Sequence, residues 1–189
     1  RMALQRLEND RLIEPGGQGK SYVVSGITEE EIADLLDARC GLELTALDLL
    51  MLKGIGQEEI DCFYRINRRM EEANEAGHIR QQFYYDQKFH DYIVQLSGNT
   101  RLIRFNESLI PQLTRMRVLS YLERSFQNKA YREHGMIIDM ISHGNRDRAI
   151  EILKDHIVST KKNYTAILTN RLNTDSIGIL SYAMTHDMR

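Results

Sequence analysis

The stretch "YYDQKFHDYIV" (Tyr84–Val94) has the apolar spacing of an α-helix, yet it places two ionisable residues on the apolar face. Asp86 and His90 are four residues apart, so their side chains share one helix face and are separated by a rise of roughly 6 Å. The same face carries Phe83, Phe89, Ile93 and Leu96. A carboxylate and an imidazole at this spacing can bind one metal ion, or they can form a hydrogen-bonded pair in the core.

Helical spacing of apolar residues extends over most of the chain from Thr28 onward and predicts an all-α fold. The first helix begins with a capping box formed by Thr28 and Glu31. Glycine stops at "SGN" (97–99) and "HGN" (143–145) end two other helices, and Pro111 should kink the fourth. The remaining helices with clear limits are expected over about 57–76, 79–96 and 147–172.

Six antiparallel helices with short links form a bundle, which we assign to residues 26–172. Residues 1–25 differ, because a short amphipathic helix is followed by the glycine-rich "EPGGQGK" (14–20) and a strand-like stretch. These elements are too few to form a core alone. We therefore expect them to be the end of a small domain whose start is missing. The tail over 173–189 has no assignable pattern.

The composition is that of a globular protein, with 42% hydrophobic and 28% charged residues in a chain of 189. No apolar run is long enough to cross a bilayer, and no segment resembles a signal peptide. Cys40 and Cys62 match no metal-binding spacing, which favours a reduced, cytoplasmic protein. The lack of a long apolar run leads us to expect no membrane partner. Because the formal net charge is only −2, any contact with nucleic acid must come from a local patch.

Two further helices also carry a histidine on an apolar face. His134 shares its stripe with isoleucines, and His156 lies with Ala149, Ile152 and Leu153. Helical bundles build metal sites from inward side chains on facing helices. One interpretation is therefore a divalent transition-metal site, with zinc ahead of nickel, manganese and iron, formed by Asp86, His90, His134 and His156. The alternative is a plain hydrogen-bonded core without a metal.

Arg39 is another polar residue on an inward face, among the leucines of the first helix. A guanidinium is always charged and grips carboxylates, so Arg39 could bind an anionic ligand or pair with Glu43 one turn on. In the first case, a small organic acid would fit between the metal and Arg39. Arg115 and Asn163 are further candidates for binding this effector, although a surface position is the simpler expectation for each.

Three stretches of the bundle carry a recognisable pattern, namely "DARCGLE" (37–43), "DQKFHDYIVQLSGN" (86–99) and "EHGMIIDMISHGNRDRAIEILKDHI" (133–157). Together they resemble the GntR family of bacterial transcription regulators, in the subfamily with a FadR-type (FCD) effector domain. The second stretch resembles that domain's signature of Asp, three residues, His and a Ser-Gly-Asn helix stop. The resemblance spans most of residues 28–172.

The amino-terminal stretch "RMALQRLENDRLIEPGGQGKSYV" (1–23) resembles the end of the family's winged helix-turn-helix domain. Arg1 falls where the family has a recognition-helix arginine that contacts DNA. The wing would contain Gln18, Gly19 and Lys20. Arg11 stands where the family usually has glycine, which leaves a helix end without its glycine cap.

The resemblance implies a homodimer that reads a palindromic operator and responds to a small carboxylate bound beside the metal. It also implies that the one aspartate and three histidines above are the metal ligands. The rival function is a metal-dependent hydrolase or lyase, since such a site with open positions could activate water, with Glu133 as a base. The winged-helix segment argues against an enzyme, so we expect a regulator.

Overall fold

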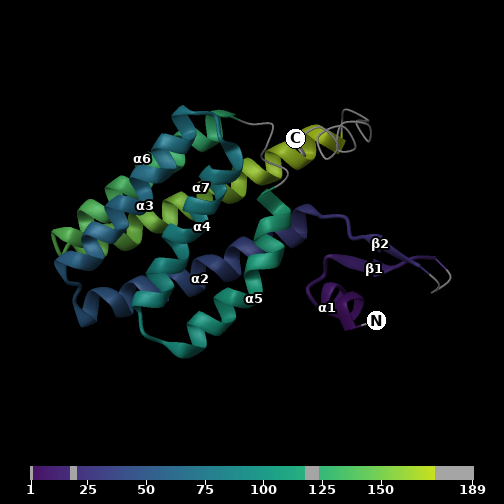
Figure 1. Cartoon of the computed structure of the whole chain (residues 1–189), viewed down its shortest axis with the longest axis horizontal. Coiled ribbons are helices and arrows are strands. Elements are labelled where there is room, and N and C mark those ends of the chain that lie inside the picture. The colour runs from purple at the N-terminus through teal and green to yellow at the C-terminus, as the bar shows by residue number, and fades with distance from the viewer. Residues whose placement is uncertain (1, 18–20, 118–123, 173–189) are drawn as a thin grey trace.

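The computed structural model describes residues 2–17, 21–117 and 124–172, and most of them are helical. An amino-terminal segment contains α1 (Met2–Asn9) and a hairpin of β1 (Ile13–Pro15) and β2 (Tyr22–Val24). The six helices of the bundle are α2 (Glu29–Lys53), α3 (Gln57–Glu75), α4 (Ile79–Leu96), α5 (Thr100–Arg117), α6 (Arg124–Ser142) and α7 (Arg146–Leu172). The predicted all-α bundle is thus confirmed (Figure 1).

The predicted capping box at the start of α2 is present. The Thr28 hydroxyl accepts a hydrogen bond from the backbone N–H of Glu31, and the Glu31 carboxylate accepts one from the backbone N–H of Thr28, each at 3.1 Å. Gly98 follows α4 with a φ of 69°, in the left-handed region that glycine tolerates best. Pro111 lies inside α5 and does not end it, and α7 begins at Arg146, one residue before the expected start.

Arg11 adopts a φ of 56°, in the left-handed region, where the family resemblance leads us to expect glycine. The turn closes in spite of the side chain. The backbone N–H of Leu12 donates to the carbonyl of Leu7, and that of Arg11 donates to the carbonyl of Glu8, each at 2.9 Å. The β1–β2 hairpin that follows is antiparallel, with Ile13 opposite Val24. None of the α1 residues is buried.

The described residues of the bundle form two apolar clusters. The larger one contains Phe63, Phe89, Ile93, Ile137 and Leu153 together with apolar residues from the second half of α2. The smaller cluster joins the start of α2 to the ends of α5 and α7 through Ile32, Leu36, Leu113, Met116 and Tyr164. Along α2 and α7, the buried polar residues lie between the segments that contribute to these two clusters. A polar site is therefore enclosed by apolar packing at both ends.

The amino-terminal segment lies at the end of the bundle where α2 begins and α5 ends (Figure 1). A guanidinium N–H of Arg115 on α5 donates to the backbone carbonyl of Arg11 at 2.5 Å. Another Nη atom of the same side chain faces the carboxylate of Glu31 at 3.5 Å. Among the described residues, none of the helices is long and apolar enough to cross a membrane.

Candidate metal centre

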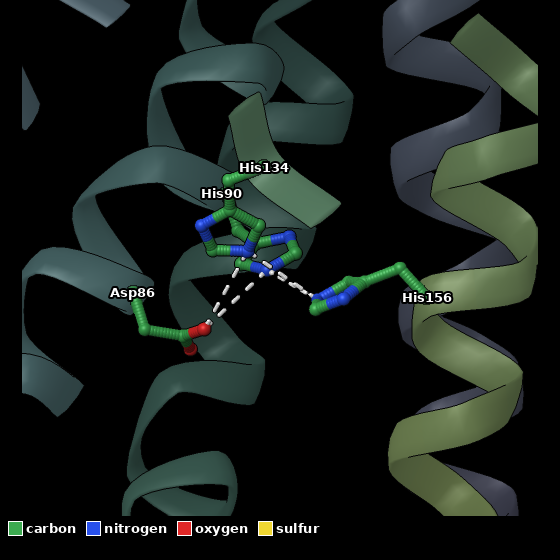
Figure 2. Close-up of side chains that lie close together, drawn as sticks. All are labelled: Asp86, His90, His134 and His156. Atoms are coloured by element: carbon green, nitrogen blue, oxygen red, sulfur yellow. Dashed lines mark hydrogen bonds and ion pairs between the residues drawn. The ribbon is translucent and has the colours of Figure 1, made fainter. Parts of the chain in front are cut away.

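Four side chains from three helices meet inside the bundle, as Figure 2 shows. Asp86 and His90 come from α4, His134 from α6 and His156 from α7. One potential ligand atom of each lies within 4.8 Å of the others. The Nε2 atom of His156 lies 3.3 Å from that of His90 and 3.4 Å from that of His134. The Oδ1 atom of Asp86 lies 3.8 Å and 3.7 Å from the Nε2 atoms of His90 and His134.

The outer nitrogen of two of these rings faces a carboxylate. His90 Nδ1 lies 2.5 Å from Oε2 of Glu43, and His156 Nδ1 lies 2.7 Å from Oε2 of Glu133. A carboxylate in this position accepts the Nδ1 proton and leaves the Nε2 lone pair pointing inward. The third ring, His134, stacks on Phe89 with ring centroids 3.9 Å apart and an interplanar angle of 11°. Each imidazole is thus oriented by a neighbour.

The charge states follow from burial and from nearby ions. Burial lowers the pKa of both His90 and His134 below the ordinary value of 6.5, which favours neutral rings at pH 7. Burial acts to raise the pKa of Asp86, but the Arg117 guanidinium, 2.8 Å from Oδ2, and the nearby histidines lower it below its ordinary value. His90 and His134 therefore present neutral imidazoles, and Asp86 presents an ionised carboxylate.

This donor set fits a metal ion better than a closed hydrogen-bond network. With Nδ1 of His90 and His156 donating to carboxylates, their Nε2 atoms are acceptors, and Oδ1 of the ionised Asp86 is an acceptor as well. Only His134 could supply a proton to this centre, which leaves acceptors facing one another at 3.3–3.8 Å. A cation would satisfy all four atoms. Three imidazoles and one carboxylate suit zinc, nickel, manganese or ferrous iron.

Arg39 lies beside this centre and is only 3% exposed. Its Nε–H donates to Oε1 of Glu43 at 2.5 Å, so the ion pair considered from the sequence is present. Its Nη2 is buried and has no hydrogen-bond partner among the described residues. Arg39, Asp86, Arg117 and His156 line a small cavity, part of which is open to solvent. The cavity walls are completed by Met70, Gln82, Phe83, Met116, Ala130, Thr160 and Tyr164.

Not every sequence-predicted site residue reaches this cavity. Arg115 instead contacts Arg11 and Glu31 at the amino-terminal end of the bundle and is not among the residues that line the cavity. Asn163 is partly buried on α7 but is not among the residues that line the cavity. The four predicted DNA-contacting residues, Arg1, Gln18, Gly19 and Lys20, lie outside the described residues, as does the tail over 173–189.

Three residues of the site were missed or only partly recognised from the sequence. Arg117 pairs with Asp86, a contact that the sequence did not indicate. The sequence suggested Glu43 as the ion-pair partner of Arg39 and Glu133 as a general base. In the structure, each carboxylate also contacts the Nδ1 atom of a histidine ring. Glu43 lies four residues after Arg39 on the same helix face, and this spacing was the available signal for its burial.

Comparison with known proteins places the chain in a family. A model of the FCD domain matches residues 34–159. The HTH-type transcriptional repressor GlaR of Escherichia coli K12 is 24% identical over 166 residues, which cover 84% of this chain and 75% of the repressor.

Solved structures share the fold. McbR/YncC of E. coli superposes with a TM-score of 0.76 at 14% identity, over 89% of this chain and 78% of that one. The metal-free FCD domain of TM0439 gives a TM-score of 0.65 at 22% identity, over 77% of this chain and 99% of that domain. The relatives are transcription regulators and not enzymes. The chain therefore belongs to the FCD-domain family of GntR transcription regulators.

Proposed function

We propose that this chain is a metabolite-responsive transcription regulator whose helical domain binds one divalent metal ion through Asp86, His90, His134 and His156. The observation that carries the proposal is the inward-facing set of acceptor atoms, held by carboxylates behind two of the rings. Zinc is the first metal to test, because it accepts imidazole and carboxylate together and has no redox requirement. When bound, the metal would offer coordination positions to the oxygens of a ligand.

The ligand is a small organic acid that lies in the cavity beside the metal. Arg39 and Arg117 both line this cavity, and the Nη2 atom of Arg39 has no partner among the described residues. A guanidinium in a buried site is a strong partner for a carboxylate, because its N–H groups match the two oxygens. Arg39 therefore binds the carboxylate end of the effector, and the apolar residues of the cavity contact its carbon skeleton.

Residues 1–25 are the end of a winged helix-turn-helix domain that contacts operator DNA, with Arg1, Gln18, Gly19 and Lys20 at the contact. The chain acts as a homodimer on a palindromic operator in the cytoplasm. Support comes from the α1–β1–β2 order of the segment and from the name of the relative GlaR, an HTH-type transcriptional repressor. The effector changes the free energy of DNA binding by the difference between its own binding free energies for the two states of the dimer.

Elemental analysis tests the metal site directly. We expect one transition-metal ion per chain in protein purified without chelator, and none after His134→Ala, because that change removes a buried ligand. His143→Ala is the matched control, since this exposed histidine follows α6 and lies outside the cluster. Unchanged metal content in His134→Ala, or no metal uptake by the wild type, would contradict the proposed site.

Calorimetry tests the effector. Titration of the metal-loaded wild type with small mono- and dicarboxylic acids should give binding that is weakened by Arg39→Met and lost after chelation. Arg115→Met is the control for Arg39→Met, because Arg115 lies away from the cavity. Equal affinities in the wild type and Arg39→Met would refute the assignment of Arg39.

A further inference from the structure

Gln82 is a buried amide in the same cavity that neither the family pattern nor the metal site explains. It lies on α4, one turn before Asp86, and is 2% exposed. Its Nε2–H donates to the backbone carbonyl of Ala73 on α3 at 3.3 Å. This bond fixes the amide orientation, because the flipped amide would set two oxygens against each other. Its Oε1 is buried and has no hydrogen-bond partner among the described residues.

The unpartnered Oε1 of Gln82 complements the unpartnered Nη2 of Arg39. One is an acceptor, the other is a donor, and both belong to residues that line the same cavity. A buried polar atom without a hydrogen-bond partner lowers the stability of the fold. A ligand that supplies a hydrogen-bond partner to both atoms would therefore gain binding free energy at each of them. Side chains four residues apart on a helix have Cβ atoms about 5–6 Å apart, so Gln82 lies roughly one turn away from the ligand atom of Asp86.

The charge of the cavity decides what kind of donor the molecule carries. Arg39 and Arg117 are positive, Asp86 is the negative residue among those that line the cavity, and a divalent metal would add further positive charge. An ammonium group would therefore be repelled in this space, whereas a neutral hydroxyl would not. A hydroxyl also donates one hydrogen bond, which is what Oε1 requires.

We propose that Gln82 is a specificity-determining residue that accepts a hydrogen bond from a hydroxyl of the effector, so that the effector is a small hydroxy acid. Its carboxylate lies at the metal and Arg39, and its hydroxyl lies about one helical turn away, at Gln82. This inference rests on the proposed function. It adds the requirement that the effector carries a hydroxyl at the end of the cavity away from the metal. A simple fatty acid would leave Oε1 of Gln82 without a hydrogen bond there.

The test compares pairs of acids that differ only in a terminal hydroxyl. Propanoate, butanoate and pentanoate are titrated into the zinc-loaded chain by calorimetry, each beside its 3-, 4- or 5-hydroxy derivative. We expect the hydroxy acid of at least one pair to bind roughly 5- to 150-fold more tightly, the range expected when a buried acceptor gains its partner. The comparison needs only the wild-type protein, so it does not depend on the folding of any variant.

Two variants identify the residue responsible. Gln82→Met keeps a similar shape without the acceptor and should remove the preference while the parent acid keeps its affinity. Gln81→Met, at the exposed neighbouring position, should leave the preference intact. Circular dichroism checks that both variants fold.

Equal affinities within all three pairs, or a preference that survives in Gln82→Met, would overturn the role of Gln82 while metal-dependent acid binding still stood. No binding of any acid to the loaded wild type would overturn the proposed function and this inference with it.

Discussion

Replacement of Glu43 by glutamine should weaken both the fold and the metal site, because this fully buried carboxylate joins two buried groups. Its Oε1 accepts from Arg39 and its Oε2 faces Nδ1 of His90, each at 2.5 Å. Burial acts to raise the pKa of Glu43, but the charge of Arg39 and contact with His90 lower it from 4.5 to about 2. At about 1.4 kcal/mol per pH unit, this corresponds to about 3 kcal/mol of stability.

The sign of this contribution is fixed by the direction of the pKa change. Because the pKa is lower in the folded protein, the stabilisation is fully present above pH 4.5 and is lost as the pH falls towards 2. At pH 7, Glu43→Gln removes the negative charge and leaves Arg39 buried without its ionic partner. We expect the metal-free variant to unfold with a free energy lower by about 3 kcal/mol, within the range measured for broken buried ion pairs.

The same substitution should lower metal affinity by about 10- to 100-fold, since the partner that orients the His90 ring is weakened. Urea unfolding in the presence of chelator measures the first effect, and competition with a chromophoric chelator measures the second. Glu72→Gln is the matched control, because this carboxylate is 45% exposed and pairs with Arg68 and Arg69 on the surface. It should change stability by less than about 1 kcal/mol and leave metal affinity unaltered.

Two results would refute this reasoning. If Glu43→Gln loses stability but binds metal as tightly as the wild type, the carboxylate neutralises Arg39 and does not orient His90. If Glu43→Gln is as stable as Glu72→Gln, the buried ion pair contributes nothing that an amide cannot replace.

Three further changes test the local structure. Thr28→Ala removes the side-chain acceptor for the backbone N–H of Glu31 and should lower stability in urea by about 1 kcal/mol. Phe63→Ala empties a fully buried position that packs edge-on against Phe89 and should cost about 3–5 kcal/mol in the same assay. Arg11→Gly relieves a left-handed backbone and should slow hydrogen exchange at the amide of Leu12, and faster exchange there would contradict this account.

Much of the fold could be predicted because its signals are local. The capping box of Thr28 and the glycine after α4 are read directly from adjacent residues, and both lie where the sequence places them. The histidines could also be assigned to inward faces, since an amphipathic stripe fixes which residues of a helix turn towards the core. His90, His134 and His156 are all buried as that pattern requires.

The partners of those residues could not be predicted, because they depend on how helices pack. Arg115 and Arg117 are two residues apart on α5, so they point to nearly opposite sides of the helix, and the sequence alone did not indicate which of them pairs with Asp86. The contact of Glu43 on α2 with His90 on α4 joins residues 47 apart. The role of Gln82 depends on a carbonyl of α3 and a cavity shared with α2, neither of which its own helix reveals.

The carboxylates around the centre hold their neighbours in place. Glu43 is engaged by Arg39 and His90, Glu133 faces His156, and one oxygen of Asp86 pairs with Arg117. Under the proposed function, these fixed groups would hold a ligand in one pose. A regulator needs this, because an effector shifts a conformational equilibrium only by the difference between its affinities for the two states.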